Sequence, residues 1–355
     1  MIDQRVQKLR RFLQSENIDA ALIVQPENRY YFSGFTGTSG FLFITPSSKY
    51  LLTDFRYAEQ AVKQSPGSTI ITYDKDVKDD LKVLLDRLDG KRIGIEENYL
   101  TYRQYKEFQE SFKREFLGIS EQVNRIRSVK DASEIQCLKK AAFLVDQAFE
   151  YIITQIKPGI SEQEISLELE FFMRRKGASG ASFDFIVASG ERSSLPHGVA
   201  GKKIIHNGDF ITMDFGCIWQ GYHSDTTRTV VMGKIDSKQA DIYQIVYQAQ
   251  TTALKEVRPG ISCHNLDRIA REIIEKNGYG SYFGHSLGHG VGLEIHETPR
   301  VGPDSSIVLE PGMVITIEPG IYIPNWGGVR IEDMVLVTSD GYQALTKAPK
   351  EILYL

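Results

Sequence analysis

Two hydrophobic periods alternate along the first ~120 residues of the chain. Val6, Leu9 and Leu13 recur at helical spacing and predict an amphipathic first helix, whereas short apolar runs bounded by turn residues predict strands. The same reasoning predicts helices at 3–14, 56–64, 77–88 and 102–112, and strands at 20–24, 41–45, 50–53, 69–73, 92–95 and 116–119. Because strands alternate with helices, we expect an α/β domain built on a mixed sheet.

A polar, charged stretch at 124–131 interrupts this alternation. The apolar pattern then returns with a helical period and predicts one long helix over 132–156. We therefore expect a first domain over residues 1–125 and a second over 126–355, since a chain of 355 residues can form two domains with separate cores.

The second domain contains an internal repeat. Lys-Pro-Gly-Ile-Ser at 157–161 recurs as Arg-Pro-Gly-Ile-Ser at 258–262, and each copy opens a helical pattern that ends at a glycine, Gly177 or Gly278. In each copy the Ser after the Pro-Gly turn is a predicted helix N-cap. Two matched segments at nearly constant offset indicate a duplicated structural unit.

A second pair of matching segments carries the acidic residues. The strand pattern Gly-x-x-Ile-Thr-x-Asp-x-Gly at 208–216 recurs as Gly-x-x-Ile-Thr-x-Glu-x-Gly at 312–320, so Asp214 and Glu318 occupy equivalent places. Each copy then sends back a second strand with another acid, Asp225 over 221–231 and Glu332 in the second copy. The repeat thus predicts a pseudo-twofold domain with four carboxylates at its centre.

Four carboxylates cannot share a pocket uncompensated, because mutual repulsion would force some of them to bind protons. Two divalent cations would resolve this repulsion, and an added imidazole would favour Mn²⁺, Co²⁺, Fe²⁺ or Zn²⁺ over Mg²⁺ or Ca²⁺. Such imidazoles lie in the Gly- and His-rich stretch 284–292, which contains His285 and His289, and at His296. All seven histidines of the chain lie at or after position 197.

Composition narrows the class of protein. The chain is 41% hydrophobic, 25% charged and carries a formal net charge of −4, with a sequence pI near 6.0. We therefore expect no nucleic-acid partner and no anionic membrane partner. No apolar run approaches the length of a membrane span, and the N-terminus lacks the apolar segment of a signal peptide. Three widely spaced cysteines form no disulfide framework, so we expect a cytoplasmic protein.

Five residues and four motifs now resemble a known family. The residues are Asp214, Asp225, His289, Glu318 and Glu332. The motifs are Leu195-Pro-His-Gly198, Gly221-Tyr-His-Ser-Asp-Thr-Thr-Arg-Thr229, Glu318-Pro-Gly-Ile-Tyr322 and Gly328-Val-Arg-Ile-Glu-Asp333. Together they resemble the two-domain metallopeptidases related to methionine aminopeptidase, namely aminopeptidase P and prolidase of the creatinase-like M24 family, over nearly the whole chain.

The resemblance implies a creatinase-type N-terminal α/β domain and a C-terminal domain with the pita-bread fold. It implies that Asp225 and Glu332 bridge two divalent metal ions, Mn²⁺ first and Co²⁺ or Zn²⁺ as alternatives. Asp214 would bind one ion, and His289 and Glu318 the other.

The resemblance also assigns catalytic and substrate-binding residues. Glu318 would act as general base or acid, and Arg330 would support the carboxylates. His197 and His296 would stabilise the reaction intermediate or bind the substrate. His285 and Tyr322 would line the substrate pocket.

The implied reaction is hydrolysis of the bond between an N-terminal residue and a following proline. Aminopeptidase P, which accepts longer peptides, is our first expectation, and prolidase, which requires a dipeptide, is the alternative. The family also implies a homodimer.

Two other classes of protein match the sequence less well. A serine hydrolase is suggested by Gly-His-Ser-Leu-Gly at 284–288, but no acid and histidine follow at the required places. A non-catalytic binding module on this scaffold is disfavoured because all five ligand positions are filled.

Overall fold

The computed structural model describes residues 1–88 and 90–355. The chain divides into two compact units, Met1–Arg127 and Ser128–Leu355, which are described separately below.

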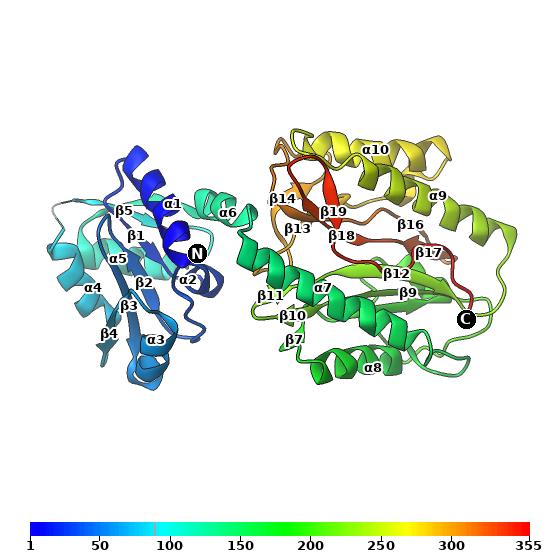
Figure 1. Cartoon of the computed structure of the whole chain (residues 1–355), viewed down its shortest axis with the longest axis horizontal. Helices are drawn as coiled ribbons and strands as arrows, with labels where there is room; N and C mark the ends of the chain where they lie inside the picture. Colours follow the sequence, from blue (N-terminus) through cyan, green and yellow to red (C-terminus); the bar gives the residue numbers. More distant parts are fainter. Residues whose placement is uncertain (89) are drawn as a thin grey trace. The chain divides into compact units, whose positions relative to one another are not determined.

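A six-stranded mixed sheet forms the centre of the first unit (Figure 1). Its strands lie in the order β4-β3-β2-β1-β5-β6; β1–β2 and β2–β3 are antiparallel, and the other pairs are parallel. In chain order the elements are α1 (Ile2–Ser15), β1 (Ala20–Ile23), α2 (Pro26–Ser33), β2 (Phe41–Ile44), β3 (Lys49–Asp54), η1 (Phe55–Tyr57), α3 (Ala58–Gln64), β4 (Thr69–Tyr73), α4 (Val77–Asp86), β5 (Arg92–Ile95), α5 (Tyr102–Phe112), β6 (Glu115–Gly118) and α6 (Ser120–Ser128).

The sheet of the first unit is covered on both faces. Leu22 and Phe43 pack into one core with Leu81 of α4 and Phe108 of α5. Neighbouring side chains of a strand point to opposite faces, so Ala21, which is also buried, belongs to the other face. A strand buried on both faces carries a continuous apolar run, which explains why these strands could be predicted from sequence.

Two helices of this region were not predicted. The eight-residue α2 begins with Pro26, ends at Gly34 with φ 81° and lacks a regular apolar period. A contact distant in sequence stabilises its start, because the buried Glu96 carboxylate accepts hydrogen bonds from the backbone N–H groups of Val24 and Gln25. The other helix, α6, ends within the polar stretch at 124–131, where we had placed the boundary between the two domains.

The second unit contains strands between two helix pairs (Figure 1). Helix α7 packs against α8 in one core, and α9 packs against α10 in another. The elements are α7 (Ala132–Ile152), α8 (Glu162–Arg175), β7 (Gly180–Ala181), β8 (Ile186–Ser189), η2 (Gly190–Ser194), β9 (Phe210–Phe215), β10 (Cys217–Trp219), β11 (Tyr222–His223), β12 (Thr226–Val231), α9 (Ser237–Lys255), α10 (Cys263–Lys276), η3 (Gly280–Tyr282), β13 (Gly288–Gly290), β14 (Glu297–Val301), β15 (Val314–Ile317), β16 (Gly320–Ile323), β17 (Gly327–Arg330), β18 (Asp333–Val337) and β19 (Tyr342–Ala344). Among the described residues, no helix has both the length and the apolar character needed to span a bilayer.

The predicted repeat is present in the backbone of the second unit. Ser161 and Ser262 are the N-caps of α8 and α10, and each hydroxyl accepts a hydrogen bond from a backbone N–H three residues on. Each serine also forms an isolated antiparallel bridge, with Ile204 or Val308. In the two copies, β9 pairs with β12 and β15 pairs with β18, both antiparallel. The duplicated sequence therefore forms a duplicated structure.

The strand expected over 221–231 is broken. It forms the short β11 and the longer β12, and Ser224 and Asp225 lie between them. The Ser224 hydroxyl accepts a hydrogen bond from the backbone N–H of Cys217, which fixes the chain at this break. Asp225 therefore precedes the returning strand rather than lying within it, and Glu332 likewise directly precedes β18.

Candidate metal centre

Each half of the repeat contributes an acid on or beside one strand and a second acid just before its partner strand. Asp214 lies on β9 and Glu318 follows β15; Asp225 and Glu332 precede β12 and β18. The two halves meet here, because the backbone N–H of Glu332 donates to the carbonyl of Thr227 over 3.1 Å. His289 lies on β13, which pairs with β15.

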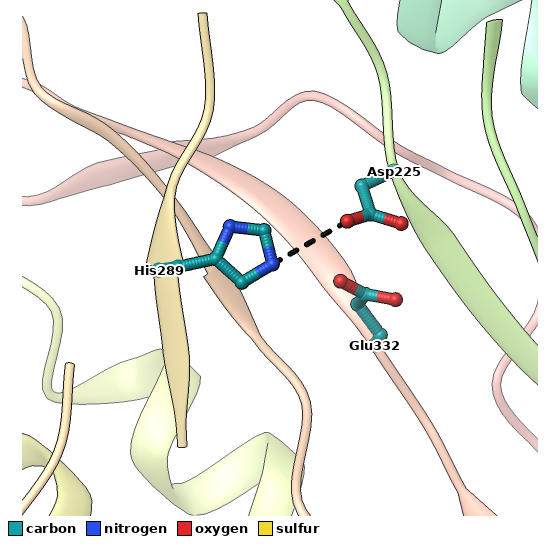
Figure 2. A group of neighbouring side chains, drawn as sticks. All are labelled: Asp225, His289 and Glu332. Atoms are coloured by element: carbon teal, nitrogen blue, oxygen red, sulfur yellow. Dashed lines mark ion pairs between the residues drawn. The ribbon is translucent and has the colours of Figure 1, made fainter. Parts of the chain in front are cut away.

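Three of these side chains converge on one point (Figure 2). Asp225, His289 and Glu332 each offer one ligand atom, and these atoms all lie within 4.8 Å of one another. His289 Nε2 is 3.5 Å from Asp225 Oδ2. A histidine and two carboxylates at this separation are donors suited to a divalent transition metal.

The other two predicted ligands adjoin this group. Glu318 Oε1 is 3.4 Å from His289 Nε2. Asp214 acts electrostatically on Asp225 and Glu332, and its Oδ2 accepts a hydrogen bond from Arg330 Nη2 over 2.7 Å. The structure thus brings all five sequence-predicted ligand residues together.

The surrounding residues do not fully compensate the negative charge of these carboxylates. Burial, followed by the neighbouring acids, raises the pKa of Asp225 and of Glu332 well above its ordinary value. Among the described residues, three buried carboxylate oxygens at this site have no hydrogen-bond partner: Asp214 Oδ1, Asp225 Oδ1 and Glu332 Oε1. Buried acceptors without donors are costly, and bound cations would satisfy them. The donor set therefore fits divalent metal ions.

The hydrogen bonds of His289 prepare one ring nitrogen as a ligand. Its Nδ1 lies 3.0 Å from the carbonyl oxygen of Gly290, which can only accept, so Nδ1 carries the proton. The lone pair on Nε2 then points toward the carboxylates, as in metal-binding histidines whose second nitrogen is held by a backbone carbonyl.

The glycines beside His289 allow close backbone packing. A Cβ at Gly288 would lie 2.0 Å from the carbonyl oxygen of Thr316, and one at Gly290 would lie 2.4 Å from that of Thr298. Since Cβ atoms cannot approach backbone so closely, β13 fits between its neighbouring strands only with glycine at both positions.

Two threonines orient the acids and were not singled out in the sequence. The Thr227 hydroxyl donates to Glu332 Oε2 over 2.8 Å. The Thr316 hydroxyl donates to Glu318 Oε1 over 3.0 Å and accepts from the backbone N–H of His289 over 3.1 Å. Thr316 belongs to the repeated Ile-Thr-x-acid pattern and Thr227 to the motif at 221–229, so both positions carried a sequence signal, but neither hydroxyl was assigned a role.

A chain of hydrogen bonds links Arg330 to His285. Arg330 Nη1 donates to the Tyr322 hydroxyl over 2.8 Å, and that hydroxyl lies 3.0 Å from His285 Nε2. His285 Nδ1 lies 2.8 Å from the carbonyl of Ser286, so Nδ1 is the protonated nitrogen and Tyr322 donates to Nε2. Burial is the main cause that lowers the pKa of His285 to about 4 and raises that of Tyr322 to about 12.

The remaining predicted histidines, His197 and His296, are both exposed. The rings of His296 and His289 meet edge to face, with centroids 4.3 Å apart. His197 lies in the loop after η2 and acts electrostatically on His285. His197 also acts electrostatically on His296, so both histidines lie near the carboxylate cluster.

Ser286 does not have the environment of a nucleophile. Its hydroxyl accepts a hydrogen bond from Arg300 Nε over 2.7 Å, and it lies in the loop between η3 and β13 rather than on a strand-to-helix turn. This geometry excludes the serine-hydrolase alternative.

Comparison with known proteins identifies the class to which this fold and site belong. Residues 136–339 match metallopeptidase family M24, and residues 5–129 match the creatinase/prolidase N-terminal domain. The chain therefore belongs to metallopeptidase family M24 and is a peptidase. The creatinase-like first domain and the pita-bread second domain, expected from the resemblance, are confirmed.

Three relatives illustrate the similarity. An Xaa-Pro dipeptidase of Pyrococcus furiosus is 42% identical over 351 residues, covering 99% of each chain. The structure of an Xaa-Pro dipeptidase from Bacillus anthracis matches with a TM-score of 0.97 and 46% identity, covering 100% of both chains. That of an X-Pro aminopeptidase from Thermotoga maritima matches with a TM-score of 0.91 and 39% identity, covering 99% of both chains.

Proposed function

We propose that this protein is an Xaa-Pro dipeptidase, which hydrolyses the bond between an N-terminal residue and a C-terminal proline. The observation that carries the proposal is the full-length similarity, above 40% identity, to proteins named Xaa-Pro dipeptidase. The cluster of four carboxylates and one histidine supplies the donors that a metallopeptidase needs.

This proposal revises the preference drawn from the sequence. The sequence alone favoured the aminopeptidase, with the dipeptidase as its alternative, and the relatives support the alternative better. An aminopeptidase acting on longer Xaa-Pro peptides stays as the second candidate, because a relative named X-Pro aminopeptidase covers the same length at 39% identity.

We assign the metal ligands by the geometry and by the resemblance. Asp225 and Glu332, the two most buried acids of the site, would hold two divalent ions together with Asp214, His289 and Glu318. Two bound ions of this kind polarise the scissile carbonyl and make water a strong nucleophile near neutral pH. Mn²⁺ is our first choice, and Co²⁺ or Zn²⁺ would suit the same donors.

The protein's own groups have separate tasks in this proposal. Glu318, whose pKa is raised mainly by burial, would accept the proton of the attacking water and return it to the departing proline nitrogen. His197 and His296, at the exposed side of the site, would bind the substrate and stabilise the charge that develops on its carbonyl oxygen.

The residues behind the acids would fix their positions. Arg330 would hold Asp214 through its 2.7 Å hydrogen bond. Tyr322 and the neutral His285 would line the pocket, where an uncharged imidazole can pack against the apolar proline ring. We also expect a homodimer, on the resemblance alone.

A comparison of substrate lengths tests the proposal. The purified chain, loaded with Mn²⁺, is incubated with Ala-Pro and with Ala-Pro-Ala, and released products are separated by liquid chromatography. We expect hydrolysis of the dipeptide and none of the tripeptide, and loss of activity in Glu332→Ala. Comparable hydrolysis of the tripeptide would replace our proposal with the aminopeptidase, and inactivity on both would refute it.

A further inference from the structure

We propose that Glu162, which lies outside the metal centre, is a positioning residue that holds the loop bearing His197 in its substrate-binding place. The inference rests on the proposed role of His197 in binding the substrate. The loop, called here the His197 loop, consists of residues 190–201 between β8 and the segment that leads to β9.

Glu162 is a fully buried carboxylate with a complete set of donors. It is the first residue of α8, and its relative exposure is 0%. Its Oε1 accepts hydrogen bonds from the backbone N–H and the hydroxyl of Ser189, both over 2.8 Å. Its Oε2 accepts from the backbone N–H of Gly201 over 3.2 Å and from Arg192 Nη1. A charge buried in this way is stable only while these donors stay in place.

These donors are located at the two ends of the His197 loop. Ser189 directly precedes the loop, Arg192 lies near its start, and Gly201 ends it. One carboxylate therefore joins the two ends, and the Arg192 guanidinium adds a hydrogen bond from Nη2 to the carbonyl of Val199 over 3.0 Å. The loop is closed by hydrogen bonds on both sides of His197.

The closed loop is also connected to the catalytic side of the domain. The carbonyl of Pro196, next to His197, accepts a hydrogen bond from Arg330 Nη1 over 3.2 Å. The Ser193 hydroxyl accepts one from the backbone N–H of Gly328 over 2.8 Å. A shift of the loop ends would therefore move His197 relative to Arg330.

The internal repeat shows that the fold itself does not require a carboxylate here. The equivalent residue in the second copy is Cys263, the first residue of α10, which is also 0% exposed. The backbone contacts agree: Glu162 N–H donates to the carbonyl of Lys203 over 3.0 Å, and Cys263 N–H to that of Ile307 over 2.8 Å. Since a small, uncharged side chain suffices in one copy, the carboxylate in the other serves the His197 loop.

Steady-state kinetics on the Mn²⁺-loaded full chain test the inference. Glu162→Gln keeps the size of the side chain but cannot accept from all of its donors, and Glu162→Cys copies the second half of the repeat. Loss of a hydrogen bond to a charged group predicts a rise in KM for Ala-Pro of roughly ten- to a hundredfold, with a much smaller change in kcat. The matched control Glu164→Gln changes an exposed carboxylate on the same helix. Its Oε2 accepts hydrogen bonds from the backbone N–H and hydroxyl of Ser161, which an amide oxygen can also accept, so KM should stay unchanged.

A double-mutant cycle separates positioning from general stability. If Glu162 acts through His197, then Glu162→Gln should change KM by less than about twofold in a His197→Ala background. An effect of full size in that background would overturn the inference. An unchanged KM in both Glu162 variants would do the same.

Limited trypsin digestion supplies a readout that needs no substrate. Well below the thermal midpoint of every protein compared, cleavage after Arg192 should be faster in both Glu162 variants than in wild type or Glu164→Gln. Equal cleavage rates in all four proteins would contradict the anchoring of the loop. Should wild type fail to hydrolyse Ala-Pro, the proposed function fails, and the digestion still decides whether Glu162 anchors the loop.

Discussion

Because His285 is buried in its neutral form, we expect the folded protein to lose stability at acidic pH, and His285→Gln to remove this part of the loss. Its imidazole is held between the Tyr322 hydroxyl and the carbonyl of Ser286, and burial is the main cause that lowers its pKa from 6.5 to about 4. In the unfolded chain this imidazole binds a proton below about 6.5, whereas in the folded chain it does so only below about 4. Its contribution to stability is therefore fully present above pH 6.5 and is lost as the pH falls toward 4.

The size of the effect follows from the difference in pKa. A pH of 5 lies about 1.5 units below the pKa of this imidazole in the unfolded chain. Proton binding therefore stabilises the unfolded state by about 2 kcal/mol, at roughly 1.4 kcal/mol per unit, and the folded state hardly at all. His285→Gln keeps an acceptor for Tyr322 but does not titrate. The free energy of unfolding of wild type should therefore fall by about 2 kcal/mol more than that of the variant between pH 7.5 and pH 5.

Urea unfolding of metal-free protein measures this difference. Trp219 and Trp326, the only two tryptophans of the chain, both lie in the second unit, so their fluorescence follows the unit that contains His285. Other titrating groups contribute equally to both proteins and cancel. His206→Gln controls for the loss of an exposed imidazole. A wild-type-minus-variant difference that is the same at both pH values would refute the argument that His285 is buried in its neutral form.

Three further predictions follow from the contacts around the acids. Arg228→Met breaks a buried ion pair with Asp333 and a hydrogen bond to the carbonyl of Glu332, so urea unfolding should show a loss of about 3–5 kcal/mol. Burial and neighbouring acids raise the pKa of Asp225 and of Glu332. Metal-free protein should therefore lose stability as the pH rises through these raised pKa values, and addition of Mn²⁺ at pH 8 should restore its thermal midpoint. Thr316→Val removes the hydroxyl that orients an acid and the His289 strand, so Mn²⁺ affinity measured by calorimetry should fall about 10–100-fold.

The sequence was informative where it repeats. Asp214 and Glu318 could be paired from the sequence alone, because the duplicated Ile-Thr-x-acid pattern places them at equivalent ends of equivalent strands. The first domain was predictable for a different reason: a sheet buried on both faces leaves long apolar runs, which alternate with amphipathic helices. Both signals can be detected in one sequence, the repeat by comparing two segments of the chain and the strands and helices from the spacing of apolar residues within each segment.

Contacts between residues far apart in the chain were not predictable. The Thr227 hydroxyl holds Glu332, and Arg228 pairs with Asp333, across more than a hundred positions. Helix α2 was missed because the carboxylate of Glu96, about 70 residues later, stabilises its start. Such side chains form these hydrogen bonds and ion pairs only once the fold has brought them together. Their residue types alone do not predict the contacts, because the same residues are also common in turns and on exposed surfaces.

Metal content, measured directly, tests the central claim that the five converging residues hold divalent ions. Wild type and Glu332→Gln are stripped with a chelator, dialysed against Mn²⁺ and analysed by mass spectrometry of bound metal, with circular dichroism as the check on folding. We expect two Mn²⁺ per chain in wild type, a clear loss of metal in the folded variant, and hydrolysis of Ala-Pro only where metal is retained. Folded wild type that binds no divalent metal, or a variant with unchanged metal content, would contradict it.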